Sequence, residues 1–246
     1  DRDKRWTNVR DNHEMYVAGH LLEGAVAYFE ATGKRKFLDV MIKTINHIER
    51  RFGPRRGQRR GYPGHQEIEL ALVKLFRLSG ERRFLDLAKF FIDERGVKPS
   101  FFEREKKARE EKSHWTDSLG LEYFQAHSPI REQNELVGHA VRAMYMCCGM
   151  ADVAAETGDE TLITTLKKLW RNTVDRRMYV TGAVGSASHG EAFTYDYDLP
   201  NETAYAETCA SIGLIFWAQR MLRLESDGEY ADVMERALYN GVLSGI

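Results

Sequence analysis

Apolar residues recur along most of this chain at the spacing of an amphipathic helix. Strand-like alternation of apolar and polar positions is nearly absent, and only five prolines interrupt the 246 residues. A period near 3.6 residues places apolar side chains on one face of a helix, whereas a strand needs a period of two. The pattern therefore predicts an all-α protein.

The predicted helices come in pairs that repeat along the sequence. Three segments share one order, in which a Gly-His pair opens an apolar helix, a glycine closes it and a second helix returns. These segments open at Gly19-His20, Gly64-His65 and Gly138-His139, and they close at Gly33, Gly80 and Gly158. A fourth helix opens near Cys209, and its turn is expected at Asp227-Gly228. Glycine suits such turns because the residue that closes a helix often adopts a left-handed conformation.

Repeated helical hairpins build either an open solenoid or a closed (α/α) barrel. His20, His65, His139 and Cys209 all stand at predicted starts of alternate helices. In a closed ring those starts would meet at one end, around a single pocket, whereas a solenoid would spread them along a surface. We therefore expect a barrel of helical hairpins that spans residues 1–246 as one domain.

Composition excludes some classes of protein. Apolar residues make up 43% of the chain, charged residues make up 30%, and the net charge is −1. These values are typical of a soluble globular protein, and they give no support for a nucleic-acid or membrane partner. Three cysteines do not suggest a disulfide framework, so we expect a reducing, cytoplasmic location. Two charged segments are expected to be excursions from this scaffold: residues 53–60 as a solvated basic loop, and residues 102–113 as an exposed loop or short helix.

A long segment rich in glycine, acids and aromatic residues separates two helical blocks at residues 182–209. Long irregular segments inside a domain are usually functional or disordered, and aromatic residues argue against disorder. The segment ends in Glu207 and Cys209, and zinc accepts both an oxygen and a sulfur ligand. Spacing alone is weak evidence for a metal, since Cys209 could equally be a small buried apolar residue.

Several motifs in this chain occur together and in order. They are Gly61-Tyr62-Pro63-Gly64-His65-Gln66-Glu67, Gln125-Ala126-His127-Ser128-Pro129, Gly138-His139-Ala140-Val141-Arg142-Ala143, Gly190-Glu191-Ala192-Phe193, Asp196-Tyr197-Asp198-Leu199-Pro200-Asn201 and Glu202-Thr203-Ala204-Tyr205-Ala206-Glu207-Thr208-Cys209. Together they resemble the β-L-arabinofuranosidases of glycoside hydrolase family 127. The resemblance runs from about Asn12 to Gly245, although such enzymes are typically more than twice as long as this chain.

The resemblance implies a retaining exo-glycosidase on an (α/α)₆ barrel followed by β-rich domains, which this chain lacks. In that family a zinc-bound cysteine thiolate replaces the second carboxylate of ordinary retaining enzymes. By motif position, Glu191 matches the general acid/base, and Glu207 and Cys209 match two of four zinc ligands. His65 and His139 match histidines that line the sugar pocket. His13 matches a third, with His20 as the alternative.

The resemblance also marks a departure. The nucleophile and the last cysteine ligand of the family lie beyond Ile246, so we expect this chain alone to be inactive and to bind zinc weakly. Cys147 and Cys148 do not replace them, because both lie in an apolar helical run and are expected in the core.

Two other functions remain open from the sequence. A metal-free sugar epimerase or isomerase on the same barrel could use His65 and His139 for proton transfer. A helical-repeat binding module would need no catalytic residues at all. The favoured reading is a glycosidase whose partner is an oligosaccharide or glycoconjugate that contains L-arabinofuranose. The oligomeric state is left open.

Overall fold

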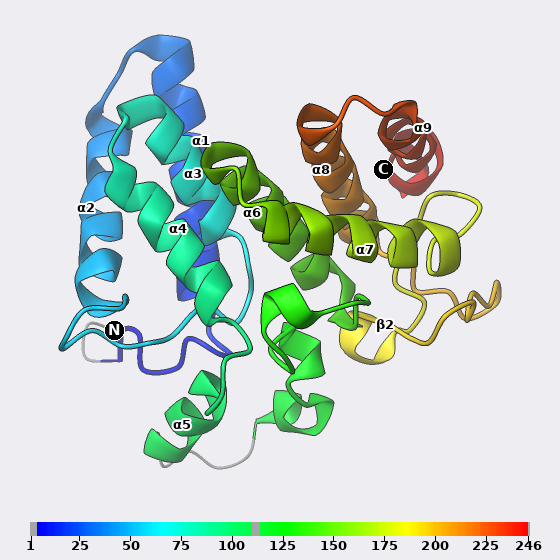
Figure 1. Ribbon diagram of the computed structural model, residues 1–246, viewed down its shortest axis with the longest axis horizontal. Coiled ribbons are helices and arrows are strands. Elements are labelled where there is room, and N and C mark those ends of the chain that lie inside the picture. The colour runs from blue at the N-terminus through cyan, green and yellow to red at the C-terminus, as the bar shows by residue number, and fades with distance from the viewer. Residues whose placement is uncertain (1–3, 110–113, 246) are drawn as a thin grey trace. The chain divides into compact units, whose positions relative to one another are not determined.

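The computed structural model describes residues 4–109 and 114–245. The chain forms two compact units, an N-terminal unit of residues 1–116 and a C-terminal unit of residues 117–246. Each unit has its own buried core, and each is described by itself below. Figure 1 shows that helices dominate both units.

The N-terminal unit contains two helical hairpins and one shorter helix. Its helices are α1 (Glu14–Thr32), α2 (Lys36–Arg51), α3 (Ile68–Ser79), α4 (Arg82–Glu94) and α5 (Phe101–Ala108). Helix α1 packs against both α2 and α3, and α3 packs against α4. Apolar side chains from all four helices are fully buried, among them Leu22, Ile45, Leu72 and Phe91.

The C-terminal unit contains two further hairpins. They are formed by α6 (Ala140–Thr157) with α7 (Glu160–Arg176), and by α8 (Thr208–Leu224) with α9 (Gly228–Arg236). Helix α6 also packs against α8, and Trp170 meets Trp217 edge-on in the core between α7 and α8. Strands β1 (Gly138–His139) and β2 (Ala192–Phe193) form a two-stranded antiparallel sheet. The described residues therefore form an all-α fold, as the periodicity predicts.

Short helical turns are also present, the first across the boundary between the units and the others in the C-terminal unit. They are η1 (Trp115–Leu119), η2 (Glu122–Phe124), η3 (Ile130–Glu132), η4 (His189–Glu191), η5 (Ala237–Val242) and η6 (Leu243–Gly245). Of these, η4 is the one that matters for chemistry, because it leads directly into β2.

Three of the predicted helix ends are confirmed. Gly33, Gly80 and Gly158 each have a φ of +66 to +73° and close α1, α3 and α6. Each donates its backbone N–H to the carbonyl four residues earlier, which satisfies a group that the helix end leaves unpaired.

Two other predicted boundaries are wrong. Helix α1 begins at Glu14, so His20 lies inside the helix and not at its start. The fourth turn does not place a left-handed glycine at a helix end. Helix α8 ends at Leu224, and Gly228 is the first residue of α9, with Asp227 as its N-cap acceptor. An aspartate N-cap supplies the hydrogen-bond acceptor that a helix start needs.

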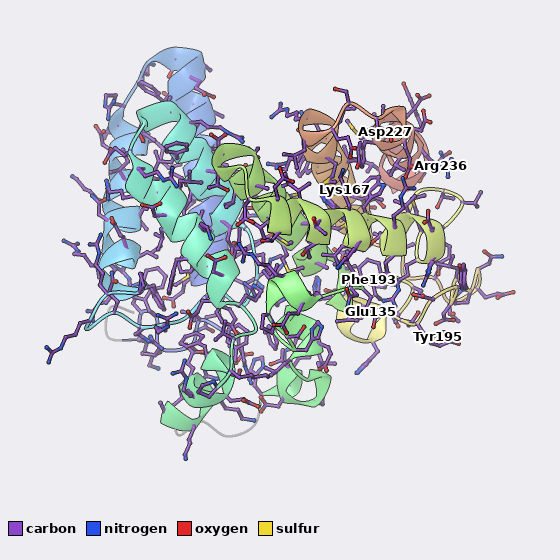
Figure 2. All side chains as sticks on the ribbon, viewed as in Figure 1. Glu135, Lys167, Phe193, Tyr195, Asp227 and Arg236 are labelled. Atoms are coloured by element: carbon purple, nitrogen blue, oxygen red, sulfur yellow. The ribbon has the colours of Figure 1, made fainter. Side chains whose placement is uncertain are left out.

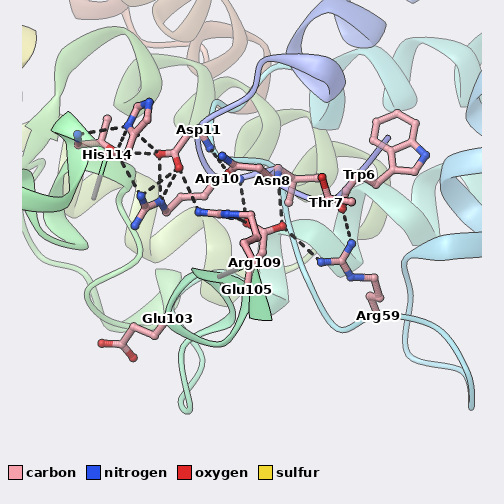
Figure 3. A network of polar contacts seen from close by, with 12 residues as sticks. Trp6, Thr7, Asn8, Arg10, Asp11, Arg59, Glu103, Glu105, Arg109 and His114 are labelled. Carbon is pink, nitrogen blue, oxygen red and sulfur yellow. Dashed lines mark hydrogen bonds and ion pairs between the residues drawn. The ribbon is translucent and has the colours of Figure 1, made fainter. Parts of the chain in front are cut away.

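The described residues of the two charged segments are mostly exposed, as predicted, but one carboxylate is buried. Residues 101–108 form helix α5, and Glu105 on this helix is buried. Its two oxygens accept the backbone N–H groups of Val9 and Arg10 at 3.0 and 3.1 Å. Arg59 and Arg109 also pair with it (Figure 3). Glu105 therefore joins residues 9 and 10 to helix α5 through these hydrogen bonds. Residues 110–113 lie outside the described residues.

The core prediction for two cysteines is confirmed. Cys147 and Cys148 are fully buried in α6, and burial raises the pKa of the Cys147 thiol well above its usual range. Cys209 is exposed, and all three cysteines are free. Among the helices of the described residues, none is long and apolar enough to cross a bilayer.

Candidate active site

The structure brings His139 and Glu191 together through the small sheet of the C-terminal unit. In the register of β1 and β2, His139 lies opposite Ala192, the residue that follows Glu191. The imidazole Nε2 of His139 lies 2.7 Å from Oε2 of Glu191. Two residues that are 52 positions apart in the sequence are therefore in hydrogen-bond contact.

The backbone on both sides of this contact is unusual. Gly138 has a φ of +70°, and a Cβ there would lie 2.1 Å from the carbonyl oxygen of Glu122, so only glycine fits. Gly190 and Glu191 have φ values of +70° and +50°. A left-handed conformation is uncommon for glutamate and has an energetic cost, so the surrounding structure must hold it. The turn presents the Glu191 carboxylate to its partners.

His139 is held in one orientation by the start of α6. It is the N-cap residue of that helix, and its Nδ1 accepts the backbone N–H of Arg142 at 3.4 Å. Because Nδ1 is the acceptor, the proton of the neutral ring resides on Nε2 and points toward Glu191. The ring also meets Tyr123 edge-on at 5.4 Å. Gln125 donates its side-chain amide to the carbonyl of His139 at 3.2 Å.

The other oxygen of Glu191 has a different partner. The hydroxyl of Tyr205 donates to Oε1 of Glu191 at 2.9 Å. This hydrogen bond, together with some burial, raises the pKa of Tyr205 to about 12. Tyr205 is not among the site residues predicted from the sequence. The available signal was its place in the motif from Glu202 to Cys209.

Glu207 and Cys209 lie at the start of α8. Glu207 is the N-cap residue of α8, and Cys209 is the second residue of the helix. The hydrogen bond with Glu207 is the main reason why the pKa of Cys209 is raised to about 11, and Glu191 adds a smaller electrostatic contribution. Oε2 of Glu207 is buried and has no hydrogen-bond partner among the described residues. The unsatisfied oxygen of Glu207 and the neighbouring thiol of Cys209 together form a donor pair that fits zinc.

A cavity of about 710 Å³ lies beside the sheet, lined by residues that include Tyr123, Glu135, Gly190, Phe193 and Tyr195. Neither Glu191 nor His139 lines it. Tyr195 is 74% exposed and projects from the outer part of the loop, while Phe193 is buried (Figure 2). The cavity therefore lies next to Glu191 and does not enclose its side chain.

In the N-terminal unit the structure groups His13 and His65. Their ring centroids are 5.8 Å apart, and Tyr16 packs against both rings at 5.5 and 4.3 Å. His65 is buried, and its Nδ1 lies 2.8 Å from the carbonyl oxygen of Gln66. Nδ1 therefore carries the proton of the neutral ring, which leaves Nε2 as an acceptor for a ligand hydroxyl.

His20 packs edge-on against the same Tyr16, with ring centroids 4.4 Å apart, and it also contacts two carboxylates. Its Nδ1 lies 3.3 Å from Oε1 of Glu67 and 3.9 Å from Oε2 of Glu23. Burial, followed by the hydrogen bond with Glu23, raises the pKa of Glu67 to about 11, so Glu67 holds a proton at neutral pH. Lys74 pairs with Glu23.

These three side chains offer ligand atoms within 4.8 Å of one another. His13 stays the predicted third histidine, with His20 as the alternative.

Comparison with known proteins places this site in a family. The whole chain, residues 1–246, matches the family described as β-L-arabinofuranosidase, GH127 catalytic domain. The chain belongs to glycoside hydrolase family 127. A non-reducing end β-L-arabinofuranosidase from Bifidobacterium longum subsp. longum is 49% identical over 245 residues, which are 98% of this chain and 37% of that protein.

Solved structures of the family agree. The crystal structure of a GH127 β-L-arabinofuranosidase from Geobacillus stearothermophilus T6 matches 99% of this chain with a TM-score of 0.96 and 59% identity, and the chain covers 38% of it. A second GH127 β-arabinofuranosidase matches 98% of the chain with a TM-score of 0.87 and 46% identity. The chain thus spans little more than a third of the length of these relatives. Within the family, its all-α hairpins correspond to part of an (α/α) barrel.

Proposed function

We propose that this chain is part of the catalytic domain of a retaining exo-glycosidase that releases β-L-arabinofuranosyl residues from an oligosaccharide or glycoconjugate. One observation carries the proposal. His139 and Tyr205 hold the carboxyl group of Glu191 by hydrogen bonds. The negative charge of that group contributes to the raised pKa of Cys209, which is paired with Glu207. Membership of GH127 and the names of the relatives support the same substrate class.

Glu191 is the general acid/base in this proposal. In the first step its carboxyl proton moves to the glycosidic oxygen as the bond from that oxygen to the anomeric carbon breaks. In that step the anomeric carbon bonds to the nucleophile, which is not among the residues of this chain. In the second step a water molecule attacks the anomeric carbon, the bond from that carbon to the nucleophile breaks, and the water gives a proton to Glu191. The carboxylate faces the Nε2 proton of His139, which stabilises the ionised form that exists between the two steps.

His139, His65 and His13 bind the sugar hydroxyl groups in this proposal. His65 would offer Nε2 as an acceptor, because its Nδ1 is engaged by the Gln66 carbonyl. A neutral imidazole with one fixed donor or acceptor can select sugars by the position of a hydroxyl group. A sugar without a hydroxyl group at that position leaves a buried polar atom unpaired, which weakens binding.

Glu207 and Cys209 would hold zinc. The unsatisfied, buried oxygen of Glu207 and its contact with the Cys209 thiol support this assignment. When bound, zinc would keep cysteine sulfur in the thiolate form that attacks an anomeric carbon. Two of the four expected ligands, including the nucleophile, are not in this chain, so we propose that the isolated chain is inactive and binds zinc weakly.

The remaining parts of the proposal concern the whole protein. We propose that residues 1–246 form an incomplete (α/α)₆ barrel and that β domains follow it in the intact enzyme. Three free cysteines favour a reducing, cytoplasmic location.

The test is product analysis with the longest natural form of the protein. An aryl β-L-arabinofuranoside should yield free L-arabinose, and the α-anomer should not react. NMR of the first product should show the β configuration, as retention requires. Conversion of a free sugar to its epimer, without cleavage of the glycoside, would show that the epimerase alternative is the correct one.

A further inference from the structure

The two oxygens of the Glu191 carboxyl group are not equivalent. Oε2 lies 2.7 Å from the Nε2 of His139, and Oε1 accepts the hydroxyl proton of Tyr205 at 2.9 Å. A phenol hydroxyl has one proton to give, and here it gives it to Oε1. Oε2 in turn accepts the Nε2–H of His139, so each oxygen of the carboxyl group has its own fixed donor.

Tyr205 is fixed relative to Glu191 by the backbone. The N–H of Tyr205 donates to the carbonyl of Ser186 at 3.1 Å, and the N–H of Ala206 donates to that of Gly185 at 2.8 Å. One residue further along, Ala187 exchanges both backbone hydrogen bonds with Ala192, at 3.1 and 3.0 Å.

The short segment 185–187 thus holds Tyr205 through one set of hydrogen bonds and the residue after Glu191 through another. The hydroxyl and the carboxyl group are brought together by main-chain bonds, and not only by their own contact. Such support is what preorganisation of an acid requires, because a displacement of about 1 Å in a reacting group can cost about 100-fold in rate.

We propose that Tyr205 is a positioning residue for the acid step. It holds the Glu191 carboxyl group in one rotamer through the hydrogen bond to Oε1. This inference rests on the proposed role of Glu191 as the general acid/base. It adds a positioning residue to that role.

The other tyrosines of the loop provide a control. Tyr197 lies in the same loop, is 70% exposed and has a φ of +64°. None of its interactions in the described structure reaches Glu191, and its backbone N–H is bonded to Arg176. Tyr197→Phe therefore removes a loop hydroxyl without touching the acid.

The experiment compares Tyr205→Phe and Tyr197→Phe in the longest natural form of the protein. Two β-L-arabinofuranosides are used, one with a 4-nitrophenyl group, which leaves without a proton, and one with a simple alkyl alcohol, which needs the acid. For Tyr205→Phe, we expect kcat/KM to fall about 10- to 100-fold with the alkyl substrate and less than about threefold with the nitrophenyl substrate. Tyr197→Phe should match the wild type with both.

The dependence on the leaving group is the readout that a merely structural role would not move. Melting temperatures should be alike in all three proteins. An equal loss with both substrates would show a merely structural role and overturn the inference, as would an unchanged Tyr205→Phe enzyme. A wild-type protein that cleaves neither substrate would instead refute the proposed function itself.

Discussion

Nε2 of His139 lies 2.7 Å from Oε2 of Glu191, and Nδ1 of the same ring caps helix α6. One imidazole therefore does two things, since it begins a helix and faces the proposed acid. The two roles can be separated by substitution, because the cap needs only a short acceptor whereas the contact with Glu191 needs the full ring.

His139→Asn is expected to separate them. Asparagine is a good N-cap residue, so the melting temperature should change little. The shorter side chain cannot reach Glu191 and also loses a sugar contact, so kcat/KM for an aryl β-L-arabinofuranoside should fall about 100-fold. Thermal unfolding and initial rates on the same preparation check this. A variant that melts far lower would show that the activity loss reflects folding, and one that keeps full activity would exclude the role of His139.

Metal content tests the donor pair at the start of α8. Glu207→Gln in the longest natural form of the protein should lose most of the bound zinc, because the buried Oε2 is replaced by a weaker ligand or by an amide nitrogen. Glu202→Gln is the matched control, since Glu202 is an exposed glutamate of the same loop. Zinc is measured per protein chain after dialysis. Equal zinc in both variants and in the wild type would contradict the assignment of Glu207.

Asp11 should make the N-terminal unit sensitive to acid. Its side chain is 1% exposed, and it accepts hydrogen bonds from Arg10 and Thr116 (Figure 3). Burial acts to raise the pKa of Asp11, but these hydrogen bonds outweigh it, so the pKa lies below its usual value. A lowered carboxyl pKa contributes stability above the unfolded value of about 3.9, and that contribution is lost as the pH falls through the folded value.

Asp11→Asn should therefore lower the free energy of unfolding by up to about 3 kcal/mol at pH 7, and the difference from wild type should shrink below about pH 4. Asp39→Asn is the control, because Asp39 forms an exposed pair with Arg35 that contributes little. Denaturant unfolding between pH 3 and pH 7 gives the free energy of unfolding of the wild type and of each variant. A deficit for Asp11→Asn that stays constant over this range would contradict the ionic origin of the effect.

The sequence predicts best the features that depend on neighbouring residues. Gly33, Gly80 and Gly158 end helices because the left-handed conformation favours glycine wherever a chain leaves a helix. The same reasoning failed at Gly228, where an aspartate cap starts the next helix and the end of α8 uses an extended residue. His20 was misplaced because the apolar pattern does not show how far α1 extends before it.

Features that depend on distant partners could not be predicted in this way. Glu105 reads as part of a solvated charge run, but the N–H groups of Val9 and Arg10, about 95 residues away, make it a buried acceptor. Tyr205 reads as one loop tyrosine among several, and only the pairing of residues 185–187 with two other segments brings it to Glu191. Glu191 itself was found through its motif, and its contact with His139 depends on the register of a two-residue sheet.

The most direct measurement of the central claim compares Glu191→Gln with Glu202→Gln in the longest natural form of the protein. The substrate is an alkyl β-L-arabinofuranoside, whose leaving alcohol needs a proton. Glutamine is close in size to glutamate but can neither give nor take that proton, so kcat/KM should fall at least about 100-fold in Glu191→Gln, with zinc content and melting temperature unchanged. Glu202→Gln should cleave the substrate like the wild type. Glu191→Gln that releases L-arabinose at the wild-type rate would contradict the account.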